Sequence, residues 1–185
     1  MHIRKMTADD IPQAEYICIK TADEKLINSE SKREITLLLY NKYYTRCEPE
    51  NCFVLADNSD LAVGYILCAE NYKRYKKSFY KNELKQLFKI KPSAVIEGIS
   101  CVMGNRIFSK NYPAHMHIDI LPEYQSKGYG TMLLTALTEQ LKKKHISGLM
   151  LIVDSSNTNA VKFYRKNNFK NIKKLAGAIV MGVKL

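Results

Sequence analysis

The sequence predicts a mixed α/β (α+β) fold built as one unit, in which a central sheet is flanked by helices. Three observations support this prediction. Short apolar or alternating runs, bounded by turn residues, recur along the chain and are typical of strands. Between them, apolar side chains return at helical spacing, most clearly at Leu133, Leu137 and Leu141. No segment repeats, and 185 residues suffice for a single domain, residues 1–185, with a sizeable core.

The N-terminal elements follow in order. Residues 2–6 alternate between apolar and polar and predict an edge strand. Thr7, which two acidic residues follow closely, indicates the start of a helix. A second helix is expected over residues 32–44. Residues 52–57 and 61–70 predict a hairpin, because turn residues separate two apolar runs.

A basic segment comes next, at about residues 71–91. It carries eight Lys and Arg residues and a single acid, Glu83, with aromatic and Leu side chains interleaved at helical spacing. Pro92 ends the segment, so we expect one basic amphipathic helix inserted between strands. Residues 94–103 are expected to form a partly strand-like connector.

The C-terminal half continues the alternation of strands and helices. Strands are expected at residues 114–121, 149–153, 169–173 and 178–183. Helices are expected over residues 128–144 and 157–167.

The composition restricts the classes of function. No apolar run approaches the roughly 18 residues needed to span a bilayer, and the N-terminus has the pattern of a strand, not of a signal peptide. Five scattered cysteines without metal-ligand spacing fit reduced thiols in a cytoplasmic protein. The net charge of +11 favours anionic partners, either nucleic acid or a polyphosphate ligand.

The most informative motif lies between the expected central strand and the helix that follows. It consists of Gln125, Ser126, Lys127, Gly128, Tyr129 and Gly130. The first N–H groups of a helix have no partner in the helix, and the helix dipole adds partial positive charge, so such a loop can bind an anion. The spacings of a dinucleotide fingerprint and of a Walker A loop are both absent. The loop therefore predicts another kind of phosphate-bearing small molecule.

A second set of residues lies about 30 positions downstream, beyond a buried strand. It comprises Asn157, Ala160, Phe163, Tyr164 and the pair Asn168 and Phe169. Each has an ordinary structural explanation as a helix cap or a core residue. Together with the Q-x-x-G-x-G loop, however, they resemble the GCN5-related N-acetyltransferase (GNAT) superfamily over nearly the whole chain. Residues 112–125 are also similar to the acetyltransferase-like domain associated with O-GlcNAcases and to its stand-alone bacterial relatives.

The resemblance implies a GNAT fold, with a twisted mixed sheet of about six to seven strands that splays at residues 115–120 to admit acetyl-CoA. Backbone amides of the loop would hold the pyrophosphate, and the backbone of Ile118 and Ile120 would pair with the pantetheine arm. Tyr164 would protonate the leaving thiolate. The implied cofactor-binding residues are Ile118, Ile120, Gln125, Ser126, Lys127, Gly128, Tyr129, Gly130, Thr131, Asn157, Phe163 and Tyr164. The family usually has Gly where this chain has Asn168, a residue that tolerates the left-handed conformation.

The general base is left open between Asp119, His117 and Glu97, ranked in that order. His115, His117 and Asp119 share one face of the strand if it is regular, whereas the bulge typical of the family would change that phase. Asp119 matches a position considered catalytic in the O-GlcNAcase-associated domains, and its alternative role is that of a buried structural carboxylate. Two imidazoles and one carboxylate make a metal site the less favoured alternative, so no metal is expected.

The expected function is an N-acetyltransferase that transfers the acetyl group of acetyl-CoA to a primary amine by direct attack. The alternative is a catalytically inactive acetyltransferase-like module that still binds acetyl-CoA. A nucleic-acid partner is disfavoured, because no nucleic-acid motif accompanies the charge. For the basic segment we favour a solvated helix packed on the core over a surface that binds an acidic substrate or the cofactor's 3′-phosphate. The resemblance allows a homodimer and leaves the amine open.

Overall fold

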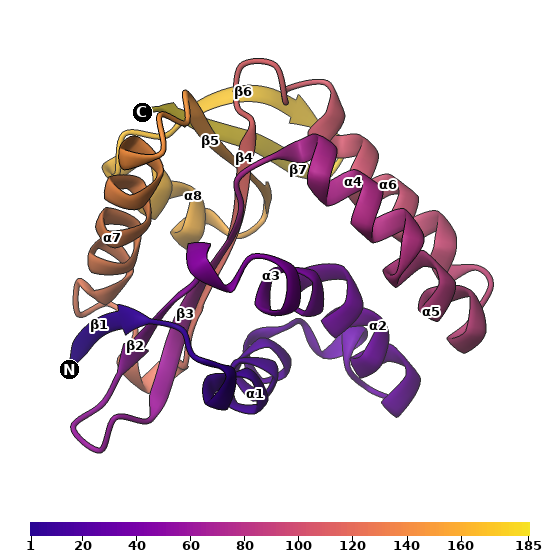
Figure 1. The fold of residues 1–185 in the computed structure, drawn as a ribbon, viewed down its shortest axis with the longest axis horizontal. Helices are drawn as coiled ribbons and strands as arrows, with labels where there is room; N and C mark the ends of the chain where they lie inside the picture. The colour runs from indigo at the N-terminus through magenta and orange to yellow at the C-terminus, as the bar shows by residue number, and fades with distance from the viewer.

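The computed structural model describes all 185 residues. Its strands form one seven-stranded sheet with the order β1-β2-β3-β4-β5-β7-β6 (Figure 1). The strands are β1 (His2–Lys5), β2 (Phe53–Ala56), β3 (Ala62–Ala69), β4 (Ala114–Ile120), β5 (Gly148–Asp154), β6 (Lys170–Leu175) and β7 (Ala178–Lys184). Neighbouring strands are antiparallel except for β4 and β5, which are parallel. The predicted mixed sheet of about six to seven strands is confirmed.

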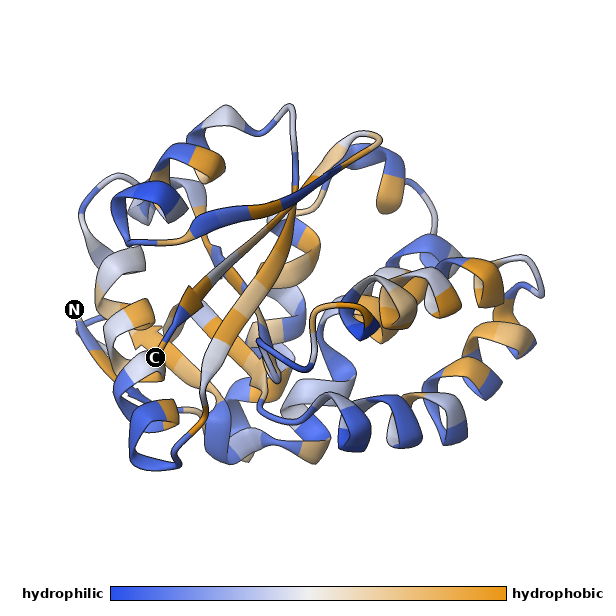
Figure 2. Cartoon of the chain, turned by 90° about the horizontal axis from the view of Figure 1, so that it is seen from above, coloured by the Kyte–Doolittle hydropathy of each residue, from blue (hydrophilic) through white to orange (hydrophobic).

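Helices cover both sides of this twisted sheet. They are α1 (Ile11–Thr21), α2 (Glu30–Tyr40), α3 (Lys42–Cys47), α4 (Tyr72–Lys81), α5 (Glu83–Ile90), α6 (Ala94–Arg106), α7 (Tyr129–Lys143) and α8 (Thr158–Lys166). Helices α7 and α8 lie on one side and the other helices on the opposite side (Figure 1). The covered central strands are strongly hydrophobic (Figure 2), and β3 is buried along its whole length. None of the helices combines the length and the apolar character needed to cross a membrane.

Strands β4 and β5 pair only where they begin, and this opens the sheet. Their pairing is limited to Ala114 with Leu149 and His115 with Met150. Beyond that point β4 stays paired with β3 as far as Ile120, whereas β5 stays paired with β7. The edge of β4 that faces β5 therefore carries backbone groups without a strand partner over residues 116–120. The predicted splay at this strand is confirmed.

Two of the predicted helices are interrupted. The helix expected over residues 32–44 forms as α2 and α3, with the break at Asn41. The basic segment expected as one helix over residues 71–91 forms as α4 and α5, which meet at Asn82. Both breaks occur at Asn, whose side chain competes for backbone hydrogen bonds and so favours helix ends over helix interiors.

The prediction of a partly strand-like connector at residues 94–103 is wrong, because these residues belong to α6. Close packing against α5 stabilises this helix. A Cβ on Gly98 would lie only 2.8 Å from the side chains of Leu84 and Leu87, so glycine is needed for the approach. Several apolar residues on the outer side of α6 are exposed, which obscures the helical period in the sequence.

Candidate active site

The loop after β4 turns the chain into the start of α7. A short 3₁₀ turn, Pro122–Tyr124, leads to Gln125, and α7 begins at Tyr129. Gly128 caps the helix with a φ of 86°, in the left-handed region that favours glycine. Ser126 also has a positive φ, of 61°. These two backbone conformations produce the sharp turn that separates β4 from α7.

Five consecutive backbone N–H groups in this loop, those of residues 126–130, have no hydrogen-bond acceptor within the protein. The N–H of Thr131 differs, because it donates to the carbonyl of Gly128 at 3.1 Å. Unpaired amides at a helix N-terminus attract anions, since the helix dipole adds partial positive charge there. The arrangement is suited to an anion at residues 126–130, whereas the amide of Thr131 is already engaged.

The side chains of Gln125 and Lys127 hold the loop in shape. Nε2 of Gln125 donates to the carbonyl of Ile120 at 2.7 Å, which ties the loop to the end of β4. Nζ of Lys127 donates to the carbonyl of Glu123 at 2.8 Å. The carbonyl of Ile120, which was predicted to pair with a ligand, thus already accepts one bond, and its second lone pair stays available.

Helix α8 packs against the start of α7 through Phe163. A Cβ on Gly130 would lie 2.9 Å from the Phe163 ring and 3.8 Å from Cδ1 of Ile120, so only glycine permits this approach. Tyr129 is half-buried and packs against the core. The contact brings α8 beside the end of β4.

Two Asn residues define the ends of α8. Oδ1 of Asn157 accepts a hydrogen bond from the backbone N–H of Ala160 at 3.0 Å and so caps the helix. Asn168 follows the helix with a φ of 67°. The prediction that Asn168 adopts the left-handed conformation in place of glycine is confirmed.

Tyr164 is buried on α8, with 8% of the residue exposed. Its ring packs against Phe163 and Phe169, at centroid distances of 5.2 Å and 5.6 Å. The hydroxyl has no hydrogen-bond partner in the protein, yet it is not fully enclosed. Burial, and then the charge of Asp119, raises the pKa of Tyr164 well above its usual value of 10.0. The hydroxyl therefore stays protonated near neutral pH and can donate its proton.

His115, His117 and Asp119 share the face of β4 opposite α7 and α8. The register between β3 and β4 is uninterrupted over these residues, so side chains alternate strictly. The bulge that the family pattern led us to consider is absent from β4. Ile118 and Ile120 consequently lie on the other face, and both pack against the core.

Asp119 is half-buried and accepts a hydrogen bond from the hydroxyl of Tyr65 at 2.5 Å. Tyr65 stands directly opposite Asp119 in the pairing of β3 with β4. Burial raises the pKa of Asp119 above its usual 3.8, and this outweighs the opposing effect of the hydrogen bond from Tyr65. A raised pKa makes the carboxylate a stronger proton acceptor.

The two histidines of β4 are neutral near neutral pH. Nε2 of His117 lies 3.1 Å from the hydroxyl of Tyr44, and burial lowers the pKa of His117 to about 4. His115 is fully buried, its Nε2 has no partner, and burial lowers its pKa to about 3. Glu97, the third-ranked candidate base, is an exposed residue of α6 whose charge helps to raise the pKa of Tyr40.

The comparison with protein families decides the family. The model of the Acetyltransferase (GNAT) family matches residues 20–169. The chain belongs to this family. The structure of this GNAT protein is similar to the crystal structure of SsHAT, with 26% identity, a TM-score of 0.86, and coverage of 99% of this chain and 97% of that one.

Two further proteins are similar to this chain. The PaiA N-acetyltransferase from Thermoplasma acidophilum, solved in complex with coenzyme A, shares the fold with 18% identity, a TM-score of 0.64, and coverage of 100% and 98% of the two chains. The [ribosomal protein bS18]-alanine N-acetyltransferase of Haemophilus ducreyi is 47% identical over 51 residues. That match covers 28% of this chain and 35% of the relative, about a third of its length.

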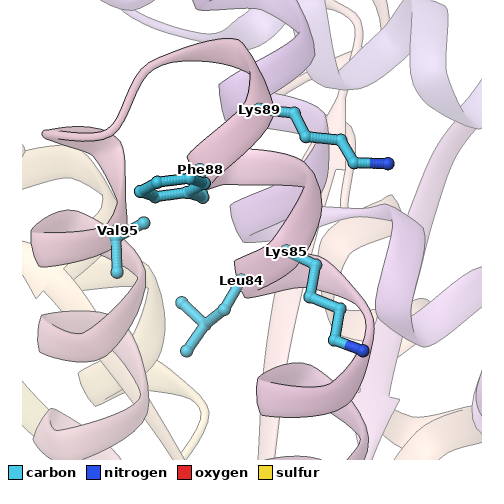
Figure 3. A pocket seen from close by; sticks show the side chains of 5 residues that line it. All are labelled: Leu84, Lys85, Phe88, Lys89 and Val95. Carbon is cyan, nitrogen blue, oxygen red and sulfur yellow. The ribbon is translucent and has the colours of Figure 1, made fainter.

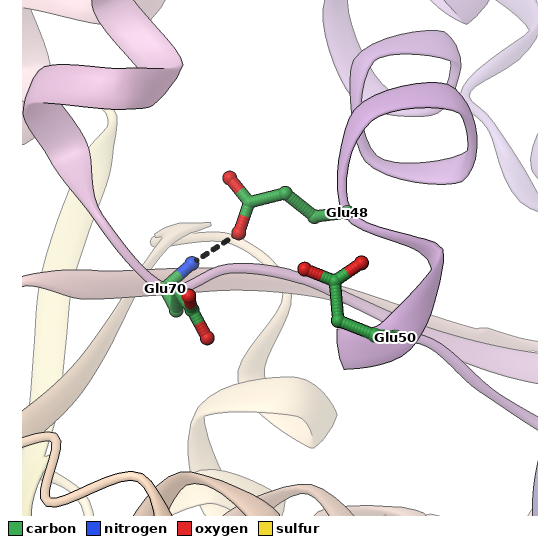
Figure 4. A group of neighbouring side chains, drawn as sticks. All are labelled: Glu48, Glu50 and Glu70. Carbon is green, nitrogen blue, oxygen red and sulfur yellow. Dashed lines mark hydrogen bonds between the residues drawn. The ribbon is translucent and has the colours of Figure 1, made fainter.

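Three glutamates form the one cluster of this GNAT protein that resembles a metal site (Figure 4). They are Glu48, Glu50 and Glu70, and the backbone N–H of Glu70 donates to Glu48 at 2.9 Å. Two cationic side chains already pair with the cluster. Arg74 lies 2.7 Å from Glu48 and 3.2 Å from Glu70, and Nζ of Lys144 lies 2.6 Å from Glu70. We interpret the cluster as an ion-pair network that ties α4 and α7 to the sheet.

Sequence reasoning missed three residues of the site. Tyr65 and Tyr44 contact Asp119 and His117, and Lys166 lines the same hollow as Gly128. A Tyr inside an apolar strand signals that its hydroxyl needs a partner. The partner itself depends on which strands and helices are neighbours, so the sequence alone does not name it.

Proposed function

We propose that the protein is an acetyl-CoA-dependent N-acetyltransferase that transfers the acetyl group to a primary amine by direct attack. The observation that carries this proposal is the split between β4 and β5, which opens beside the unpaired amides of residues 126–130 and beside α8, the helix of Tyr164. Family membership and a structural neighbour solved with coenzyme A support the same co-substrate.

Acetyl-CoA would be held in parts along this split. The amides of residues 126–130 would bind the pyrophosphate, and Lys166 would add positive charge beside Gly128. The free edge of β4 at Ile118 and Ile120 would pair with the pantetheine arm as with an added strand. The side-chain amide of Asn157 would donate to the same arm, because only its oxygen is used in capping α8.

The chemistry requires one proton acceptor and one proton donor. The amine nitrogen forms a bond to the thioester carbon, the carbon–sulfur bond breaks, and a backbone amide near Ile120 polarises the carbonyl. Asp119 takes the proton that the amine loses. Tyr164 gives its proton to the departing sulfur. Burial shifts both pKa values upward, which keeps Tyr164 protonated and makes Asp119 more basic.

Asp119 is favoured over His117 and Glu97 as the base. Nε2 of His117 is already engaged with Tyr44, and its pKa of about 4 leaves it weakly basic. Glu97 is exposed on α6. Asp119 is close enough to Tyr164 for its charge to affect the pKa of that hydroxyl, so the two can act on one reacting centre.

A titration with acetyl-CoA, followed by thermal denaturation, tests the co-substrate. A ligand at about 100 times its Kd stabilises the native state by about 2.7 kcal/mol, which is easily detected. Free-thiol release across a panel of amines, including peptides with free N-termini, then tests transfer. Stabilisation without thiol release from any amine would favour the inactive binding module, and the absence of stabilisation would contradict the proposal.

A further inference from the structure

An exposed apolar surface covers α5 and α6. Of the twelve large apolar side chains exposed in the chain, five lie within twenty residues: Phe88, Ile96, Ile99, Met103 and Ile107. Phe88 is 61% exposed, Ile96 is 69% exposed and Ile107 is 79% exposed. Scattered single residues of this kind are ordinary, whereas a contiguous set indicates an interaction surface.

The spacing along α6 shows why these residues are unpartnered. Ala94, Gly98 and Val102 recur every four residues and are buried. Ile96, Ile99, Met103 and Ile107 recur at three and four residues and form a separate stripe. The helix therefore has one apolar face that packs inside the protein and a second that faces outward.

A groove between α5 and α6 continues this stripe (Figure 3). Leu84, Phe88 and Val95 line this open groove together with Lys85 and Lys89 of α5, and its volume is about 380 Å³. Tyr72, Tyr75 and Phe79 of α4 and Leu87 of α5 are buried and Tyr80 is half-buried, so the preferred packing interpretation of the basic segment holds. Its lysines, however, remain outside, and its only acid, Glu83, is buried. The groove is thus apolar inside and positively charged at its rim.

The same surface reaches the side of the sheet that carries Asp119. A Cβ on Gly104 of α6 would lie 3.0 Å from Cδ1 of Ile152 in β5. The pairing of His115 with Met150 puts Ile152 on the same face of the sheet as His117 and Asp119, across the split. Ile152 is 40% exposed. Ile152 therefore brings exposed apolar surface of β5 into contact with α6 beside the split.

We propose that this surface binds the polypeptide that carries the acceptor amine, through a segment of mixed apolar and acidic side chains. The inference rests on the proposed function, since it names the class of amine that the transferase acts on. Gly104 and Ile96 are eight residues apart, about 12 Å along a helix, a distance that an extended peptide spans in about four residues. Apolar residues about four positions beyond the peptide residue that lies at Gly104 would then contact Ile96 and Phe88.

The lysines of the groove and its position on the helix that contacts β5 beside the split favour a polypeptide over other occupants. A groove flanked by two lysines receives single apolar and acidic side chains, whereas a bilayer requires an apolar surface that projects. A second copy of this chain would bring another strongly basic surface, because the net charge is +11. Glu97, the only acid of α6, is exposed and is not among the residues that line the groove.

Three twelve-residue peptides with a free N-terminus and a C-terminal fluorophore test the proposal by fluorescence anisotropy. Each begins with four Gly and Ser residues, and the remainder contains Leu, Phe and Glu. The second peptide replaces Leu and Phe with Ser, and the third replaces Glu with Lys. The first should bind about tenfold more tightly than either of the others, as expected where a few anchors dominate binding.

Variants of the surface make the test specific. Phe88→Ser combined with Ile96→Ser should weaken binding of the first peptide about tenfold. Lys85→Glu combined with Lys89→Glu should reverse the preference toward the lysine peptide. Leu61→Ser, at an exposed Leu in the turn between β2 and β3, is the matched control and should change nothing. All these side chains are exposed or half-buried, so the variants should fold.

Thiol release separates this inference from the proposed function. The twelve-residue peptide should have a lower KM than its first four residues alone, and the Phe88 and Ile96 double variant should remove only that difference. Equal binding of the three peptides, or unchanged binding by the variants, would overturn the inference. Binding to vesicles, or formation of a dimer, would also overturn the inference if the Phe88 and Ile96 double variant abolished it. The surface would then bind a membrane or a second copy of the chain. If no amine releases thiol, the transferase proposal fails, and the anisotropy results still decide the surface.

Discussion

Replacing Tyr164 with Phe tests the proposed proton donor by the smallest change that the site allows. The variant loses one hydroxyl that has no partner in the protein, and it keeps the ring that packs against Phe163 and Phe169. The free energy of unfolding should therefore change by less than about 1 kcal/mol, the net value of a typical hydrogen bond. The turnover number should fall about 100- to 10,000-fold, the usual contribution of a positioned acid. That loss corresponds to about 2.7–5.5 kcal/mol of transition-state stabilisation.

Free-thiol release at saturating acetyl-CoA and amine measures the turnover number, and calorimetric titration measures the Kd of acetyl-CoA. We expect the Kd to be unchanged, because the cofactor would be held mainly by backbone groups. Tyr16→Phe, at an exposed Tyr of α1, is the matched control and should behave as wild type. A Tyr164→Phe variant with the wild-type turnover number would refute the role of donor. A variant with a lowered melting temperature would show a structural role instead.

Three further changes test other parts of the structure. Gly128→Ala should weaken acetyl-CoA binding and lower the free energy of unfolding by about 1–2 kcal/mol, because a φ of 86° strains alanine. Unchanged binding of acetyl-CoA in a titration would contradict the proposed role of the loop. Asp119→Asn should lower turnover yet raise the melting temperature at neutral pH. The pKa of Asp119 is raised in the folded state, so ionisation of this carboxyl destabilises the protein as pH rises from 3.8 through the higher value. Asn carries no charge and still accepts a hydrogen bond from Tyr65. A melting temperature below that of the wild type would contradict this prediction. Arg74→Met leaves the buried carboxylate of Glu48 without its cation and should lower the free energy of unfolding, measured with denaturant, by about 2–3 kcal/mol. The loss is smaller than for a fully buried pair because Arg74 is half exposed. A loss below about 1 kcal/mol would show that other groups compensate the charge of Glu48.

The elements that the sequence predicts best are those with long, regular spacing. Leu133, Leu137 and Leu141 predict α7, and each is fully buried. Helix α6 was missed, because its outward stripe breaks the amphipathic pattern on which such predictions rely. Its stability comes from contact with α5 at Gly98, which no local pattern reports. The breaks at Asn41 and Asn82 were missed for a related reason, since a helix pattern can continue in phase across a short interruption.

The residues of the candidate site also differ in how well the sequence predicts them. The loop at residues 125–130 combines backbone conformation and helix position, both of which are local, so its spacing in the sequence already indicates an anion site. The partners of Asp119 and His117 are Tyr65 and Tyr44, which are 54 and 73 residues away in the chain. Their contacts depend on the register of β3 with β4 and on the packing of α3 over the sheet.

The sequence by itself determined the mixed α/β class, most of the strands and helices, the spacing of the loop at residues 125–130 and the resemblance to the family, because these depend on periodicity and on residue types at fixed local spacing. Only the tertiary structure decided that residues 94–106 form a helix, which groups perturb the pKa values of Asp119 and Tyr164, and which apolar side chains stay exposed on α6. Those properties arise from burial and from contacts between segments far apart in the chain. Desolvation in particular is a property of the folded surroundings and is not carried by any residue alone.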